Sequence, residues 1–295
     1  LRLCTAATAL AGLAACDHDH DDGDHDHDRA VELRFAAVVG AEPFACTKTF
    51  TVGAVELEPL DFRLYVHGVQ LVDADGGKWP VTLSDDGLWQ DGAVVLLDFE
   101  DKSGTCVNGT TEVNDVVKGT VDTGHNAIEF EGVELEVGVP FDENHQDVAA
   151  AASPLNLSGL FWSWQGGYKF MRLDMKMAGT EGGSAHGDGI NVHLGSTGCT
   201  LAEGTTEVGS CSAPNRPHVA LDGFDPADDT IVIDYAAVVA GLDLMADAGG
   251  APGCMSGADD PECATIFDHL GLDLATGLPK AGQTVFSVES AQGGQ

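Results

Sequence analysis

Short β-strand patterns separated by glycine-rich turns are the feature that most constrains the fold of this chain. Apolar residues at 133, 135, 137 and 139 alternate with glutamate or glycine, and this period of two is typical of a strand with one buried face. Helical patterns are confined to 236–246 and to 260–270, where Pro261 stands near the first turn. Further β-rich runs occupy 31–39, 62–72, 94–99, 128–130, 161–177, 190–194, 230–235 and 284–288.

Many short strands with few helices predict a mainly β protein. We expect one β-sandwich-like domain over residues 31–290, with a few short helices near the C-terminus. No internal repeat and no linker composition divides this segment. Some 265 residues follow the first 30, which is enough to bury one large core.

The first residues have the pattern of an export signal. Residues 1–15 contain one arginine and a run of alanine and leucine that is too short to span a bilayer. Leu13-Ala14-Ala15-Cys16 resembles a bacterial lipobox, in which Cys16 becomes the lipidated first residue of the mature chain. An ordinary signal peptide cut nearby is the alternative. We expect a periplasmic or outer-membrane lipoprotein of a Gram-negative-type bacterium, which touches the membrane only through its lipid.

Residues 16–30 are predicted to form a disordered tether. Positions 17–28 hold seven Asp and four His and no apolar residue, so the segment has nothing to bury. Imidazole and carboxylate groups together suit divalent copper, zinc or nickel. Weak metal capture and a solvated spacer are both open interpretations, and the imidazoles in question are those of His18, His20, His25 and His27.

The acidic charge excludes several classes of partner. The formal net charge is −35, and residues 1–30 contribute only −5 of it. A domain of about −30 is unsuited to nucleic acid and to anionic bilayers, and it attracts cations.

Six cysteines lie beyond the signal and the lipobox, an even number that indicates three disulfides in an oxidising compartment. Fifteen connectivities are possible. We favour Cys46–Cys106, Cys199–Cys211 and Cys254–Cys263, of which the last two close short loops rich in Gly, Pro and Ser. No spacing typical of a structural zinc site is present.

An aromatic run at 161–170 holds two of the four tryptophans of the chain. On an extended strand, Trp162 and Trp164 would share one face, and Gly166-Gly167 would allow a bulge or a close backbone approach. One interpretation is a pair of core anchors. The other is a redox-active or modified tryptophan near a metal.

In ordered motifs spread over most of 31–290, the chain resembles the MbnP family of periplasmic copper-binding proteins, also called the four-Cys members of metallo-mystery pairs. The motifs that carry the resemblance are Leu33-Arg34-Phe35, Pro43-Phe44-Ala45-Cys46, Asp61-Phe62-Arg63, Tyr65-Val66-His67, Leu96-Leu97-Asp98-Phe99, Val137-Gly138-Val139-Pro140-Phe141, Asn144-His145, Pro154-Leu155-Asn156-Leu157, Trp162 to Phe170, His193 to Cys199, Pro214-Asn215-Arg216 and Gly223-Phe224-Asp225-Pro226.

The resemblance implies histidine ligation of copper, because imidazole suits both Cu(I) and Cu(II). His67, His145 and His193 lie within the matching motifs and are the expected ligands, each with a hydrogen-bonded structural role as the alternative. The resemblance also implies a partner, an MbnH/MauG-like di-haem enzyme of the cytochrome c peroxidase class. That partner would oxidise Trp162 or Trp164 to kynurenine.

No nucleophile elbow, phosphate loop or zincin motif is present. We therefore expect a non-catalytic, exported copper-binding protein that is the substrate of its partner. The alternatives are a structural or adhesive lipoprotein without a specific metal site, and a copper oxidoreductase with an open coordination position.

Overall fold

Two large sheets dominate the computed structural model, which describes residues 28–124, 126–180, 188–246 and 248–291. The first sheet has six strands, and all its pairs are antiparallel except β1 with β17. Its order is β18 (Phe286–Glu289), β17 (Thr230–Asp234), β1 (Asp28–Val39), β8 (Val116–Asp122) and β6 (Thr82–Leu83), with β2 (Glu42–Pro43) paired to β1.

The second sheet has eight strands and is organised around β4, which is 19 residues long. Its order is β13 (Gly189–Leu194), β12 (Met171–Met177), β4 (Val55–Asp73), β9 (Phe130–Val137) and β16 (His218–Asp222), with β3 (Phe50–Val52), β5 (Lys78–Pro80) and β7 (Val95–Asp98) also paired to β4.

Two small hairpins and a few short helices complete the described fold. The hairpins are β10 (Phe161–Ser163) with β11 (Gly167–Tyr168), and β14 (Thr197–Leu201) with β15 (Val208–Ala213). The helices are α1 (Phe141–Asn144), η1 (Ser158–Leu160), α2 (Tyr235–Val238) and α3 (Pro261–His269). Within the described ranges, no helix is long and apolar enough to cross a membrane.

The expected helix over 236–246 is wrong in its extent. Only α2 forms there, with the Asp234 side chain accepting a hydrogen bond from the amide of Ala236 at its start. Gly241 follows with a φ of +78°, a left-handed conformation that ends a helix. The second expected helix is confirmed as α3, which begins at Pro261.

The alternating pattern of the strands builds the main core of a β-sandwich, as predicted. On β1, the side chains at 31, 33, 35, 37 and 39 are buried while most of their neighbours are exposed. Apolar side chains from strands of both sheets join them in one cluster, including Leu64, Leu135, Leu173 and Ile231. Burial of such side chains contributes about 1.5–3 kcal/mol each, so this cluster is the main source of stability.

A second apolar cluster lies on the other side of β4 and positions the candidate site. Leu64 and Val66 belong to the main core, whereas Tyr65 between them belongs to the second cluster. The second cluster also takes in Val139, Leu160, Tyr168 and Phe170 from the segments that follow β9. Both faces of β4 are therefore covered here, which explains why its buried residues run continuously instead of alternating.

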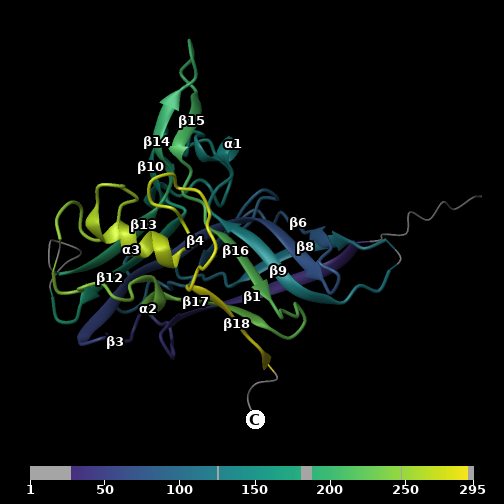
Figure 1. Cartoon of the computed structure of the whole chain (residues 1–295), viewed down its shortest axis with the longest axis horizontal. Coiled ribbons are helices and arrows are strands. Elements are labelled where there is room, and N and C mark those ends of the chain that lie inside the picture. Colours follow the sequence, from purple (N-terminus) through teal and green to yellow (C-terminus); the bar gives the residue numbers. More distant parts are fainter. Residues whose placement is uncertain (1–27, 125, 181–187, 247, 292–295) are drawn as a thin grey trace, which may run out of the picture.

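The β14–β15 hairpin forms an arm that projects from the body of the molecule (Figure 1). Its two strands pair only with each other. The Cys199–Cys211 disulfide joins them at directly opposed positions. Figure 1 also places α1 and β10 beside the base of the arm.

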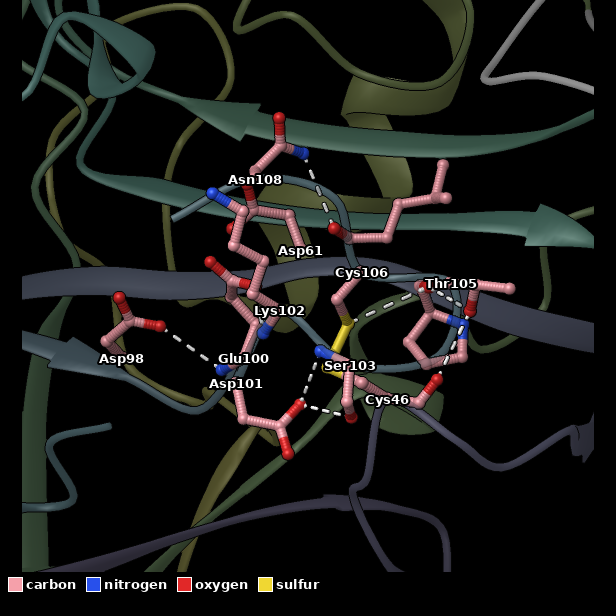
Figure 2. Close-up of a disulfide and its surroundings, with 12 residues drawn as sticks. Cys46, Asp61, Asp98, Glu100, Asp101, Lys102, Ser103, Thr105, Cys106 and Asn108 are labelled. Atoms are coloured by element: carbon pink, nitrogen blue, oxygen red, sulfur yellow. Dashed lines mark hydrogen bonds between the residues drawn. A yellow bond between two sulfur atoms is a disulfide. The ribbon is translucent and has the colours of Figure 1, made fainter. Parts of the chain in front are cut away.

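The three disulfides favoured from the sequence are those that form: Cys46–Cys106, Cys199–Cys211 and Cys254–Cys263. Figure 2 shows the first of them beside the loop that follows β7. There the Asp98 carboxylate accepts a hydrogen bond from the Glu100 amide, and a Glu100 carboxylate oxygen accepts one from the Lys102 amide. The disulfide thus anchors a loop that is also held by buried acidic side chains.

We predict that replacing both Cys46 and Cys106 by alanine lowers the free energy of unfolding by about 4 kcal/mol. The bond closes a loop across 60 residues of sequence, and its loss releases conformational entropy in the unfolded chain. Urea unfolding of the variant and the parent measures this difference. Non-reducing mass spectrometry of the parent should find no free thiol among the six cysteines, and a free thiol at position 46 or 106 would contradict the assignment.

A buried ion-pair network crosses β4, β12 and β13. The fully buried Asp61 carboxylate accepts hydrogen bonds from Arg63 Nε at 2.7 Å and Arg63 Nη2 at 2.5 Å. Its Oδ2 also lies 3.1 Å from Arg172 Nε. Arg172 reaches Asp174 at 2.8 Å, and Asp174 in turn contacts His193. The two carboxylates and the two guanidinium groups of the network therefore neutralise one another inside the sheet.

Candidate metal centre

His67 presents an unpartnered nitrogen next to the second apolar cluster. It lies on β4 opposite Glu136 of β9. Its Nε2 is buried and makes no hydrogen bond, although Glu136 Oε2 approaches to 3.5 Å. Burial, with a smaller contribution from the charge of Arg216, lowers the pKa of His67 to about 4. The imidazole is therefore neutral near pH 7, and its ring has a lone pair available to a metal ion.

His145 follows α1 and has one nitrogen held by the backbone. Its Nδ1 lies 3.0 Å from the carbonyl oxygen of Trp164, and a carbonyl only accepts, so Nδ1 carries the proton. The lone pair is then on Nε2, which lies 3.2 Å from Asn144 Nδ2 and 3.5 Å from Cys211 Sγ. Burial lowers the pKa of His145. The Phe141 ring packs edge-on against the imidazole at 5.2 Å between centroids.

Arg216 is a half-buried cation whose charge acts on both histidines, and no role was expected for it from the sequence. Its Nε donates to the Val139 carbonyl at 2.7 Å, and its guanidinium lies 4.8 Å from the centre of the Phe170 ring. Burial lowers the pKa of Arg216 to about 10. Its charge contributes to the lowered pKa of both His67 and His145. The charge of Arg216 thus disfavours the protonation of both imidazoles.

Comparisons with known proteins place the chain in a family. The MbnP family model matches residues 28–256. The chain belongs to the MbnP family. A solved structure of MbnP from Methylosinus trichosporium superposes with a TM-score of 0.77 at 32% sequence identity, covering 90% of this chain and 99% of that one. No curated protein matches the sequence.

In this MbnP family member, His193 belongs to the buried ion-pair network of β4, β12 and β13. Its Nε2 lies 2.8 Å from Asp174 Oδ1. The strand register sets His193 opposite Arg172, and Arg172 opposite Arg63, which is four residues from His67 along β4. His193 is therefore hydrogen-bonded through one ring nitrogen within this network. Its role as a copper ligand stays a prediction.

The two tryptophans of the aromatic run do not share a strand face, so that expectation is wrong. β10 ends at Ser163, and Trp164 lies in the turn that follows. The turn is tight because Gly167 has a φ of +78° and lies so close to Asn144 that a side chain there would clash. The Trp164 side chain is 45% exposed. Trp162 is half-buried, and the two indoles have different surroundings.

Trp162 lines an open cavity of about 560 Å³ at the base of the arm. Its ring rests on Gly195, where an added Cβ would lie 2.5 Å from the indole. Cys199 and Met255 line the same cavity, and Gln165 donates a hydrogen bond to the Cys199 carbonyl at 2.9 Å. Because Cys199 is bonded to Cys211, which contacts His145, the disulfide connects the cavity to His145.

Several expected features lie outside the described residues. They are the export signal, the lipidation site Cys16 and the tether histidines His18, His20, His25 and His27. Their roles stay predictions.

Proposed function

We propose that this MbnP family member is an exported copper-binding protein whose copper ligands include His67 and His145. The observation that carries the proposal is the buried, unpartnered Nε2 of His67, since a buried polar atom without a partner calls for a ligand. The imidazoles of His67 and His145, whose pKa values are both lowered by burial, offer nitrogen donors that suit copper. The family relationship supports copper as the ion.

The surroundings of these imidazoles support metal binding at neutral pH. Protons compete with a metal for an imidazole lone pair, and burial lowers the pKa of both imidazoles. The Arg216 charge opposes a bound copper ion as it opposes a proton, so the metal gains nothing from it over the proton. The Nδ1 hydrogen bond of His145 to the Trp164 carbonyl fixes the ring orientation. The net charge of −35 raises the local concentration of cations.

We further propose that Trp162 is the tryptophan oxidised by a di-haem partner of the peroxidase class, so the protein is a substrate and not a catalyst. Two peroxide equivalents insert two oxygen atoms and cleave the indole C2–C3 bond, with two waters released. Hydrolysis then removes C2 as formate and leaves kynurenine. The aromatic amine and ketone of kynurenine are donors that the indole lacks. Trp162 is favoured because its ring lines the cavity that meets His145 at the disulfide.

The test is expression of the protein with and without its di-haem partner, followed by peptide mapping and copper dialysis. Conversion to kynurenine changes the mass by about +4 Da, as expected from atomic masses for a side-chain oxidation. We expect this change at residue 162 together with a rise in copper affinity. Trp162→Phe should abolish both effects, whereas the matched variant Trp164→Phe should retain them. Intact indoles at both positions beside an active partner would refute the modification.

Deletion of residues 17–28 is expected to leave the tightest copper equivalent in place. The composition of residues 17–28 predicts a disordered segment, so we expect ordering entropy to oppose metal binding by its histidines. His67 and His145, in contrast, are held by β4 and by α1 with its backbone contact. Equilibrium dialysis should show the loss of weak additional equivalents only. Loss of the tight equivalent in the deletion would move the specific site into the tether.

A further inference from the structure

A second set of donors lies beside His145. Its Nε2 and the Sγ atoms of Cys199 and Cys211 all lie within 4.8 Å of one another. The contact between Nε2 and Cys211 Sγ is 3.5 Å. Because Nδ1 is the donor to the Trp164 carbonyl, Nε2 carries the lone pair. This lone pair now accepts a hydrogen bond from Asn144 Nδ2 at 3.2 Å, which a bound metal ion would replace.

The arm holds the two sulfur atoms together without needing their bond. Cys199 and Cys211 are directly opposed in the antiparallel register of β14 and β15, and side chains at such positions are neighbours. Register pairs on both sides, Thr197 with Ala213 and Thr200 with Ser210, keep the strands aligned. Two thiols at these positions would therefore stay close to each other and to His145.

This disulfide is also the most accessible of the three. Cys199 is 9% exposed at the cavity lined by Trp162, and Cys211 is half-buried. The four cysteines of the other two bonds are between 0% and 3% exposed. Thiol–disulfide exchange requires a thiolate to reach a sulfur atom, so a mild reductant should open this bond first. The other bonds are Cys46–Cys106 and Cys254–Cys263.

We propose that the Cys199–Cys211 disulfide is a reducible metal site that, once opened, binds Cu(I) through both sulfur atoms and His145. A dithiol reductant supplies two electrons and two protons. It becomes a disulfide itself, and the S–S bond of the protein becomes two thiols. Each thiol releases its proton when it binds Cu(I), a soft ion that prefers thiolate ligands.

The inference rests on the proposed copper function and deepens it. In the oxidised protein, His145 offers copper one nitrogen donor, as the proposed function requires. In the reduced protein, His145 has two sulfur donors at contact distance, and these favour the monovalent ion. Reduction of one bond would thus change the donor set at a single histidine and raise the affinity for Cu(I).

The experiment compares the purified full-length protein before and after passage over an immobilised dithiol, which leaves no free reductant. Alkylation and peptide mapping should find thiols at 199 and 211 alone. Anaerobic titration against a chromogenic Cu(I) chelator should then show an affinity about tenfold or more higher than in the oxidised protein. X-ray absorption at the copper edge should show sulfur in the coordination shell.

Two variants make the result decisive. Cys199→Ser with Cys211→Ser should fold, as shown by an unchanged circular dichroism spectrum, and lose the gain and the sulfur signal. His67→Ala should weaken copper binding in the oxidised protein and keep the Cu(I) site in the reduced one, which separates this inference from the proposed function. Reduced thiols at 199 and 211 with no sulfur on copper, or earlier opening of the buried disulfides, would overturn the proposal.

Discussion

Replacing His67 by alanine is expected to lower the copper affinity of the oxidised protein about 100-fold or more, since loss of a supporting residue alone costs 10–100-fold at metal sites. The variant removes the one imidazole whose Nε2 is buried and unpartnered. Competition titration with a chelator of known affinity measures the change. Some loss of stability is expected from the cavity that the buried ring leaves, so urea unfolding should confirm that the variant is folded under the titration conditions.

The matched control is His218→Ala. His218 lies on β16 opposite Glu136, the residue that also faces His67 from β9. Its side chain is exposed, however, and its Nε2 contacts Glu134 Oε2 at 3.2 Å. The affinity of this variant should equal that of the parent. Equal copper binding by His67→Ala and His218→Ala would place the metal elsewhere.

Asp61→Asn is expected to lower the free energy of unfolding by about 3–5 kcal/mol, the range found when one partner of a buried ion pair is removed. The substitution keeps the shape of the side chain and removes the charge that faces Arg63 and Arg172. Two guanidinium groups then remain near an uncharged amide in a sheet that is covered on both faces. Urea unfolding followed by tryptophan fluorescence gives the value, and an unchanged slope shows that the unfolding remains two-state.

Asp268→Asn serves as the control for the Asp61 variant. Asp268 pairs with Lys280 at 2.6 Å, but both side chains are exposed to solvent. Exposed ion pairs contribute little, so we expect no measurable loss. If both variants unfold at the same urea concentration, the charge of Asp61 does not contribute to the stability of the fold.

The sandwich could be predicted from the sequence because its main core depends on local alternation. The pattern on β1 carries the information about which face is buried, and the observed burial follows it. The second cluster could not be predicted in the same way. Tyr65 is buried by Leu160, Tyr168 and Phe170, which are distant in sequence, so local periodicity contains no sign of the contact.

The candidate site was predictable in part. Motif resemblance pointed to His67, His145 and His193, whereas Arg216 stood in a matching motif without an assigned role. Its role appears only when the fold brings its charge to two imidazoles. The tryptophan pair was misjudged because strand spacing was assumed to continue past Ser163, where Gly166-Gly167 instead allow a tight hairpin.

The β14–β15 arm can vary in length without disturbing the sandwich, and it offers a position for a fluorescent label. Because β14 and β15 pair only with each other, residues added between Leu201 and Val208 extend no core strand. Doubling the length of such a loop costs only about 0.6 kcal/mol of closure entropy. Relatives can therefore differ in the length of this hairpin while keeping the same sandwich, and its far end is a suitable position for a fluorophore that reports on events at the base.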